Sequence, residues 1–178
     1  MIRYPSSFIF FVILFVGISL YQIKHFITKK EIELTQIQNN IKSAKSDIKI
    51  LNLSSLYQTK PVGITEQPDF INAVIEIEYN KTPKDLLKLL LNIEKFFGRV
   101  RLIKNGPRII DLDIIIFGNT ALNEGDLVIP HPRMFERSFV MLPLMEIAPN
   151  LKINEIPIET LVRNISTTDI IKITDEHF

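Results

Sequence analysis

The stretch Ile109-Ile-Asp-Leu-Asp-Ile-Ile-Ile-Phe117 places two aspartates in a run that is otherwise apolar and rich in β-branched residues. Such a run predicts a buried strand. Side chains alternate along a strand, so Asp111 and Asp113 leave the same face with their Cα atoms roughly 6–7 Å apart. Two carboxylates in apolar surroundings are costly unless a cation or a hydrogen-bond donor satisfies them.

A second block, Ile129-Pro-His-Pro-Arg-Met-Phe-Glu-Arg-Ser-Phe139, carries His131, Arg133 and Arg137. Converging carboxylate oxygens suit Mg²⁺, which takes one or two carboxylates together with phosphate oxygens and water. The cationic residues of this block, with Arg108, are of the types that hold polyphosphate. The two blocks together predict nucleotide-dependent phosphoryl transfer. His131 lies between two prolines and is therefore expected in a rigid extended loop.

The composition is that of an ordinary globular protein. The 178 residues suit one domain over residues 1–178, with 46% apolar and 23% charged residues. A formal net charge of +1 argues against a nucleic-acid surface, which needs a basic excess. The chain has no cysteine, which excludes disulfides and thiolate metal sites and is compatible with a cytoplasmic location. We expect a monomer that acts on small molecules.

Residues 8–20 form an almost unbroken apolar run near the start of the chain. A membrane-spanning helix needs about 17–25 such residues, so the run is short for an anchor. A signal-peptide core would fit the length, but no small-x-small cleavage site follows. A first strand over residues 11–16, ending at Gly17, is the favoured interpretation, and the other two stay open because length alone does not separate them.

Patterning along the rest of the chain predicts a mixture of strands and helices. In order, we expect a strand over 11–16, a helix over 28–44, a strand over 48–57, a loop over 59–63, a strand over 71–78, a helix from 82 to 98, a strand over 109–117 and a turn at 118–119. This order predicts an α+β fold with a ferredoxin-like βαββαβ core, a mainly antiparallel sheet and helices packed on it. Residues from Pro149 onward are weakly patterned and are expected to form a peripheral C-terminal extension.

The helix over residues 82–98 has the clearest signals. Thr82 is a plausible N-cap, Pro83 occupies the first helical position and Asp85 stands three residues after the cap. Gly98 is expected to end the helix. The apolar stripe that should face the core consists of Leu86, Leu89, Leu90, Ile93 and Phe97.

Taken singly, the candidate residues also have structural explanations. Arg108 could be a structural ion-pair partner, and Arg99 and Arg101 could interact with the dipole of the preceding helix. Phe70 and Phe139 could belong to the core. Neither a Walker-type glycine loop nor the G-x-G-x-x-G fingerprint is present, so arginines and a metal would have to hold a nucleotide. Histidines at the spacing of zinc ligands are absent as well.

Several blocks of sequence follow one another in a specific order. They are Ser54-Ser-Leu-Tyr-Gln-Thr-Lys-Pro-Val-Gly63, Gln67-Pro-Asp-Phe-Ile-Asn-Ala73, Gly98-Arg-Val-Arg101, Gly106-Pro-Arg-Ile-Ile-Asp-Leu-Asp113 and the block that ends at Phe139. Together they resemble the 6-hydroxymethyl-7,8-dihydropterin pyrophosphokinase family. The resemblance covers residues 53–149 nearly without gaps.

The resemblance implies an ATP-dependent diphosphokinase of folate synthesis. This enzyme would transfer the diphosphoryl group of ATP to the hydroxymethyl group of the dihydropterin, giving AMP and the pterin diphosphate. Two Mg²⁺ ions bound by Asp111 and Asp113 would clamp the attacking and leaving oxygens. The resemblance also implies roles for other residues. The catalytic groups would be Arg99, Arg101, Arg108 and His131, and these four would contact ATP together with Ile114 and Arg137. The residues around the pterin would be Thr59, Pro61, Phe70, Asn72 and Phe139.

Within the pterin pocket, the resemblance implies that Phe70 and Phe139 sandwich the flat ring and that Asn72 reads its amide edge. The chain departs from the family at Gly17-Ile-Ser-Leu20, where Gly-Ser-Asn-Leu is usual, and at Asn105, where an aromatic residue is usual. Residues 17–49 also match poorly. The departures leave open a degenerate member that binds nucleotide or pterin without turnover. The apolar run leaves open an active domain that residues 8–20 tether to a membrane.

Overall fold

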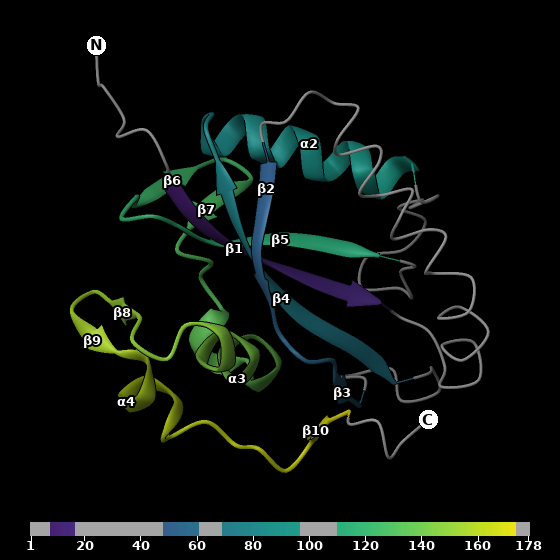
Figure 1. Cartoon of the computed structure of the whole chain (residues 1–178), viewed down its shortest axis with the longest axis vertical. Coiled ribbons are helices and arrows are strands. Elements are labelled where there is room, and N and C mark those ends of the chain that lie inside the picture. Colours follow the sequence, from purple (N-terminus) through teal and green to yellow (C-terminus); the bar gives the residue numbers. More distant parts are fainter. Residues whose placement is uncertain (1–7, 17–47, 61–68, 97–109, 174–178) are drawn as a thin grey trace.

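The computed structural model describes residues 8–16, 48–60, 69–96 and 110–173, and for residues 8–16 the backbone alone. Figure 1 shows these elements arranged around a central sheet. They are β1 (Phe8–Val16), β2 (Ile48–Leu53), β3 (Tyr57–Thr59), β4 (Phe70–Tyr79), α2 (Pro83–Phe96), β5 (Asp111–Phe117), β6 (Leu122–Glu124), β7 (Leu127–Ile129), η1 (Met134–Glu136), α3 (Ser138–Ile147), β8 (Lys152–Ile153), β9 (Ile156–Pro157), α4 (Ile158–Val162) and β10 (Ile170–Lys172).

β1 is an inner strand of the main sheet. The strand order is β10-β3-β4-β1-β5, with β2 also paired to β4, and every pairing is antiparallel. The apolar run near the start of the chain therefore forms a strand, as favoured, and this strand is longer than residues 11–16. In the described part of the chain, no helix has the length and apolar character needed to cross a membrane. The α+β class is confirmed.

Both faces of the sheet are covered by helices. On β4, Val74 packs in a cluster with α3 and α4, whereas Ile77 and Tyr79 pack in a second cluster with α2. Even-numbered and odd-numbered residues of a strand leave opposite faces, so α3 and α2 lie on opposite sides of β4. Because helices cover both faces of β4, this strand is buried along most of its length rather than on one face only.

The start of α2 confirms the predicted N-cap. The backbone N–H of Asp85 donates to Oγ1 of Thr82 at 3.2 Å, and the Thr82 hydroxyl donates to the Asp85 carboxylate at 2.7 Å. These hydrogen bonds hold the pKa of Asp85 below its ordinary value. Leu86 and Leu90 of the predicted stripe are buried. Phe97 and Gly98, where the helix was expected to end, lie outside the described residues, as does the helix expected over 28–44.

The single strand predicted over residues 48–57 is wrong, because two strands occupy this region. β2 and β3 pair with different halves of β4. Ser54 separates them: its N–H donates to the carbonyl of Val74 at 2.9 Å, and its hydroxyl accepts the N–H of Val74 at 2.9 Å. The side chain thus replaces one backbone partner in the ladder. Thr59, predicted in a loop, ends β3 instead.

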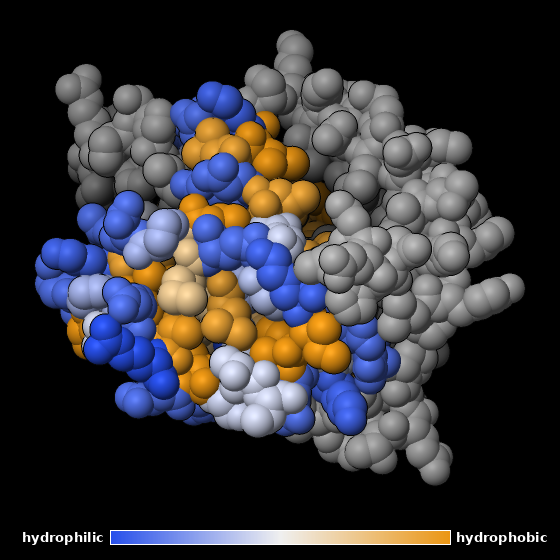
Figure 2. Space-filling model, turned by 60° about the horizontal axis from the view of Figure 1, so that its bottom comes forward, coloured by the Kyte–Doolittle hydropathy of each residue, from blue (hydrophilic) through white to orange (hydrophobic). Residues whose placement is uncertain are grey.

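Neither α3 nor the role of the C-terminal segment follows from the sequence pattern. α3 is apolar on nearly all sides and contains Pro143, so it lacks a clear helical stripe. The expectation of a merely peripheral extension is wrong, since Ile153, Ile158 and Val162 belong to the core cluster of α3 and β10 joins the sheet beside β3. Elements of two to five residues are too short for their sequence to show a hydrophobic period. Figure 2 turns the lower part of Figure 1, where α4 and β10 lie, toward the viewer and shows apolar patches among hydrophilic residues.

The position of β1 makes a test of the fold possible. A chain that begins at Ser19 lacks β1, so β4 and β5 lose their backbone partners on that side. Each buried polar group left unpaired costs about 1–3 kcal/mol, and a domain is stable by only about 5–15 kcal/mol. We expect this truncated chain in the insoluble fraction of a lysate, with the full chain expressed in parallel as control. A soluble product that unfolds cooperatively would contradict the placement of β1.

Candidate active site

Asp111 and Asp113 lie at the start of β5, half-buried and on the same face, as predicted. The register of β1 identifies that face. Ile13 is the partner of Asp113 on one side and of Val74 on the other. Partners directly opposite each other in antiparallel strands share a face. Because Val74 packs against α3, the two carboxylates also lie on the α3 side of the sheet.

His131 approaches this face from the loop before η1. Its backbone N–H donates to the carbonyl of Ile115 at 2.8 Å, which ties the loop to β5. Its Nδ1 accepts the backbone N–H of Arg133 at 3.2 Å, so the neutral ring carries its proton on Nε2. Nε2 lies 3.8 Å from Oδ2 of Asp113. The loop position predicted from the flanking prolines is confirmed, whereas the Arg133 side chain is exposed.

Arg137 reaches the same carboxylate. Its Nη1 lies 4.0 Å from Oδ2 of Asp113, and its guanidinium lies 5.6 Å from the ring centroid of Phe139. Burial lowers the pKa of Arg137, but an arginine still remains charged. Burial is also the largest cause that lowers the pKa of His131, and nearby Arg137 and Arg133 reinforce it against the opposing effect of Asp113. His131 is therefore neutral at physiological pH.

Asn72 of β4 is fully buried and offers an acceptor. Its Nδ2 donates to the carbonyl of Tyr57 at 3.2 Å and to Oγ1 of Thr59 at 3.0 Å. The Tyr57 carbonyl can only accept a hydrogen bond, so its contact identifies the amide nitrogen as the atom facing β3. Oδ1 has no hydrogen-bond partner in the described part of the chain. A buried acceptor without a partner is costly, so this atom is suited to accept an N–H from a ligand.

The amide and the carboxylates lie in one row across the sheet. Phe15 of β1 is the register partner of Asn72 in β4 and of Asp111 in β5. Asn72 and Asp111 are therefore on the same face, separated by two inter-strand spacings or about 9–10 Å. This surface combines paired carboxylates, a neutral histidine, a charged arginine and an oriented amide, which suits the binding of a polyphosphate beside a flat polar ring.

Comparison with known proteins identifies the family. The model of the family described as 7,8-dihydro-6-hydroxymethylpterin-pyrophosphokinase matches residues 28–149. The chain belongs to this family. Among its relatives, the 2-amino-4-hydroxy-6-hydroxymethyldihydropteridine pyrophosphokinase of Haemophilus influenzae is 42% identical over 132 residues, which are 74% of this chain and 82% of the relative. The Bacillus subtilis protein of the same name is 41% identical over 105 residues, or 59% of this chain and 63% of the relative.

Some relatives in this family are much longer than the present chain. The folic acid synthesis protein fol1 of Pneumocystis carinii is 48% identical over 104 residues, which are 58% of this chain but 14% of that protein. The corresponding protein of Dictyostelium discoideum is matched over 17% of its length. The chain thus spans a minor part of these proteins and less than two thirds of the Bacillus subtilis relative.

The structure locates only some of the residues that the pyrophosphokinase resemblance implies. Arg99, Arg101, Arg108 and Pro61 lie outside the described residues. Ile114 is buried in the α2 cluster, on the face opposite the carboxylates, so its side chain cannot reach a nucleotide there and only its backbone could. Phe70 begins β4 as the register partner of Thr59, and Phe139 lies in the first turn of α3, partly buried against the core.

Glu94 of α2 supports the strand that carries the two aspartates, and it was not among the residues predicted from the sequence. Its side chain is almost completely buried, with 1% exposed, and its Oε1 accepts the backbone N–H of Leu112 at 2.7 Å. Leu112 lies between the two aspartates, and β5 ends the strand order of the sheet. Glu94 thus fixes the backbone that carries both carboxylates. The sequence did contain a signal that Glu94 is buried, because Glu94 falls four residues after Leu90, on the apolar stripe of the helix.

This contact predicts a large effect of Glu94 on stability. Replacing Glu94 by alanine leaves the Leu112 N–H without this acceptor, which costs about 1–3 kcal/mol in the free energy of unfolding. The matched control is Glu159→Ala, because Glu159 pairs with Arg163 on the surface, where both side chains are about 70% exposed. We expect the control to change stability by less than about 0.5 kcal/mol. Equal effects of the two substitutions in urea unfolding would contradict the assignment.

Proposed function

We propose that this chain transfers the diphosphoryl group of ATP to 6-hydroxymethyl-7,8-dihydropterin, giving AMP and the pterin diphosphate in folate synthesis. Membership of the pyrophosphokinase family and the names of its relatives support this reaction. The observation that carries the proposal is the row of residues on the α3 face. It joins an oriented amide on β4 to a carboxylate on β5, so that a ring and a phosphate chain can be held side by side.

The pterin is proposed to bind at the β3–β4 end of this row. Asn72 Oδ1 accepts an N–H from the amide edge of the ring, since its Nδ2 is already held by Tyr57 and Thr59. Phe70 and Phe139 stack on the two faces of the ring, where aromatic contacts are worth about 0.5–1.5 kcal/mol beyond their buried area. Pro61 and Thr59 complete the pocket.

ATP is proposed to bind over the start of β5. Asp111 and Asp113 fit Mg²⁺, because they present hard oxygens on one face and leave the other ligand positions to phosphate and water. Two Mg²⁺ ions bound there would neutralise charge on the attacking and leaving oxygens. His131 and Arg137 beside Asp113, with Arg99, Arg101, Arg108 and the backbone of Ile114, hold the phosphates. These residues position the substrates and neutralise charge, so the transfer needs no covalent nucleophile.

We also infer that the core is ferredoxin-like. Support comes from the antiparallel order β3-β4-β1-β5, which is the order that a βαββαβ chain produces when a helix follows β1. The helix expected over residues 28–44 would make that connection. A net charge of +1 and the lack of cysteine further support a cytoplasmic enzyme that acts on small molecules and binds no nucleic acid, and we propose that it is a monomer.

The direct test of the proposed function is AMP release from ATP and Mg²⁺, measured with and without 6-hydroxymethyl-7,8-dihydropterin. We expect AMP to form only when the pterin is present, in equal amount to the pterin diphosphate. ATP or pterin binding by calorimetry without AMP would indicate a degenerate family member. Absence of both binding and turnover would refute the proposal.

The carboxylates should be essential for turnover. Asp111→Asn or Asp113→Asn removes a charged oxygen ligand, and we expect kcat to fall about 100-fold or more, the scale of losing one electrostatic contact to a transition state. The fold should persist, as judged by circular dichroism, because both side chains are only half-buried. The control is Asp126→Asn, in the exposed turn between β6 and β7. Activity close to that of the wild type in either site variant would exclude the metal assignment.

The Asn72 side chain should contribute to the binding of the pterin and not to the binding of ATP. Asn72→Ala removes the acceptor for the ring, so we expect the Kd for the pterin to rise about 10–100-fold, the equivalent of roughly 1–3 kcal/mol. The Kd for ATP should change less than about twofold, because the phosphate site lies two strands away. Isothermal titration of each ligand measures both values, with Asn123→Ala, exposed on β6 of the separate two-stranded sheet, as control. Equal losses for the two ligands would argue against the pterin pocket.

A further inference from the structure

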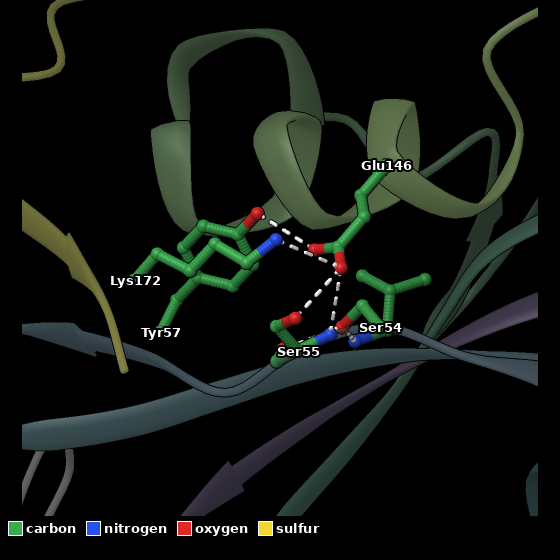
Figure 3. Close-up of polar contacts among 6 residues, drawn as sticks. Ser54, Ser55, Tyr57, Glu146 and Lys172 are labelled. Carbon is green, nitrogen blue, oxygen red and sulfur yellow. Dashed lines mark hydrogen bonds and ion pairs between the residues drawn. The ribbon is translucent and has the colours of Figure 1, made fainter. Parts of the chain in front are cut away.

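The carboxylate of Glu146 joins segments that are distant in the sequence. Figure 3 shows it at the end of α3, pointing toward the start of β3 and toward β10. Its Oε1 accepts the backbone N–H of Ser55 at 3.2 Å, the Ser55 hydroxyl at 2.7 Å and Nζ of Lys172 at 3.1 Å. Its Oε2 accepts the hydroxyl of Tyr57 at 2.7 Å. One side chain therefore holds α3, the β2–β3 connection, β3 and β10 together.

This network differs from an ordinary surface ion pair, which contributes little to stability. The Glu146 side chain is 27% exposed, and its donors include a backbone N–H and two hydroxyl groups besides the ammonium of Lys172. Burial alone would raise the pKa of Glu146, but these hydrogen bonds outweigh it and the pKa lies below its ordinary value. Burial, reinforced by the hydrogen bond to Glu146, raises the pKa of Tyr57. The carboxylate thus stays charged and the phenol stays protonated.

The network is directly connected to the amide of the proposed pterin pocket. Tyr57 is the register partner of Lys172 on one side and of Asn72 on the other. Its carbonyl accepts one N–H of the Asn72 amide, and Thr59, two residues further along β3, accepts the other. β3 has only three residues, and a short ladder to β4 on one side and β10 on the other holds its backbone, with Glu146 as the side-chain contact to α3. The orientation of Asn72 therefore depends on where β3 is held.

We propose that Glu146, through Tyr57 and Lys172, is a positioning residue for pterin recognition. It fixes β3 so that both acceptors for the Asn72 amide stay in place and Oδ1 stays turned toward the ligand. The proposal rests on the function proposed above. Loosening this three-residue strand would weaken the hydrogen bonds that orient the Asn72 amide, and this should be measurable as weaker pterin binding.

The test compares the binding of the two substrates in the full chain. Glu146→Gln and Lys172→Met should each raise the KM and Kd for 6-hydroxymethyl-7,8-dihydropterin by about tenfold, the scale of one lost hydrogen bond. The Kd for ATP should stay within about twofold and kcat within about threefold, since the phosphate site is on other strands. Lys172→Arg keeps a cation in place and should restore wild-type pterin binding. Glu159→Gln, in the exposed pair with Arg163, is the matched control.

A merely structural role gives a different pattern. In that case Glu146→Gln would lower the melting temperature and the active fraction without changing either Kd, which would overturn the proposal. Equal weakening of pterin and ATP binding would also overturn it. If Glu146→Gln fails to fold, Tyr57→Phe removes one donor while the ring remains, and it should show the same selective loss. A wild-type chain that binds no pterin would refute the proposed function, whereas an active wild type with unaffected variants would refute only the role of Glu146.

Discussion

The pairing of β1 with β4 on one side and β5 on the other is the constraint on which the rest of the structure depends. Phe15 is the register partner of both Asn72 and Asp111, and this places the amide and the first carboxylate on one face. Because side chains alternate with a period of two, a slip of one residue against either neighbour would put them on opposite faces. The candidate site therefore depends on the register of a strand that contributes none of its predicted binding residues.

Local signals in the sequence were sufficient for the elements that do not depend on distant partners. The cap at Thr82, the β-branched run of β5 and the prolines around His131 each act over a few residues. The break between β2 and β3 was not predictable in this way, because it depends on the hydrogen bonds of Ser54 with Val74, which is 20 residues away. The core contacts of the C-terminal segment also depend on residues distant in the sequence, and they were not predicted either. The family resemblance indicated which residues bind substrates, but it did not indicate the contacts that hold those residues in place.

The two ends of the row on the α3 face are held by carboxylates from different helices. Glu94 of α2 accepts the N–H of Leu112 between the two aspartates, at the β5 end. Glu146 of α3 holds Tyr57 and Lys172 at the β3–β10 end. Outer strands of a sheet have backbone groups without a partner strand and fewer neighbours, so they are the parts most able to move. A reaction that relies on positioning needs such strands to be restrained on both sides.

Burial has different consequences for the charges of His131 and Arg137. Burial lowers the pKa of both His131 and Arg137. For histidine the lowered pKa keeps the ring neutral at physiological pH, because the ordinary value of about 6.5 already lies below that pH. Arginine keeps its charge, because its ordinary value is several units higher. The permanent positive charge beside Asp113 thus comes from Arg137, while His131 supplies one N–H from Nε2. Such a surface can hold a polyphosphate without depending on the protonation of an imidazole.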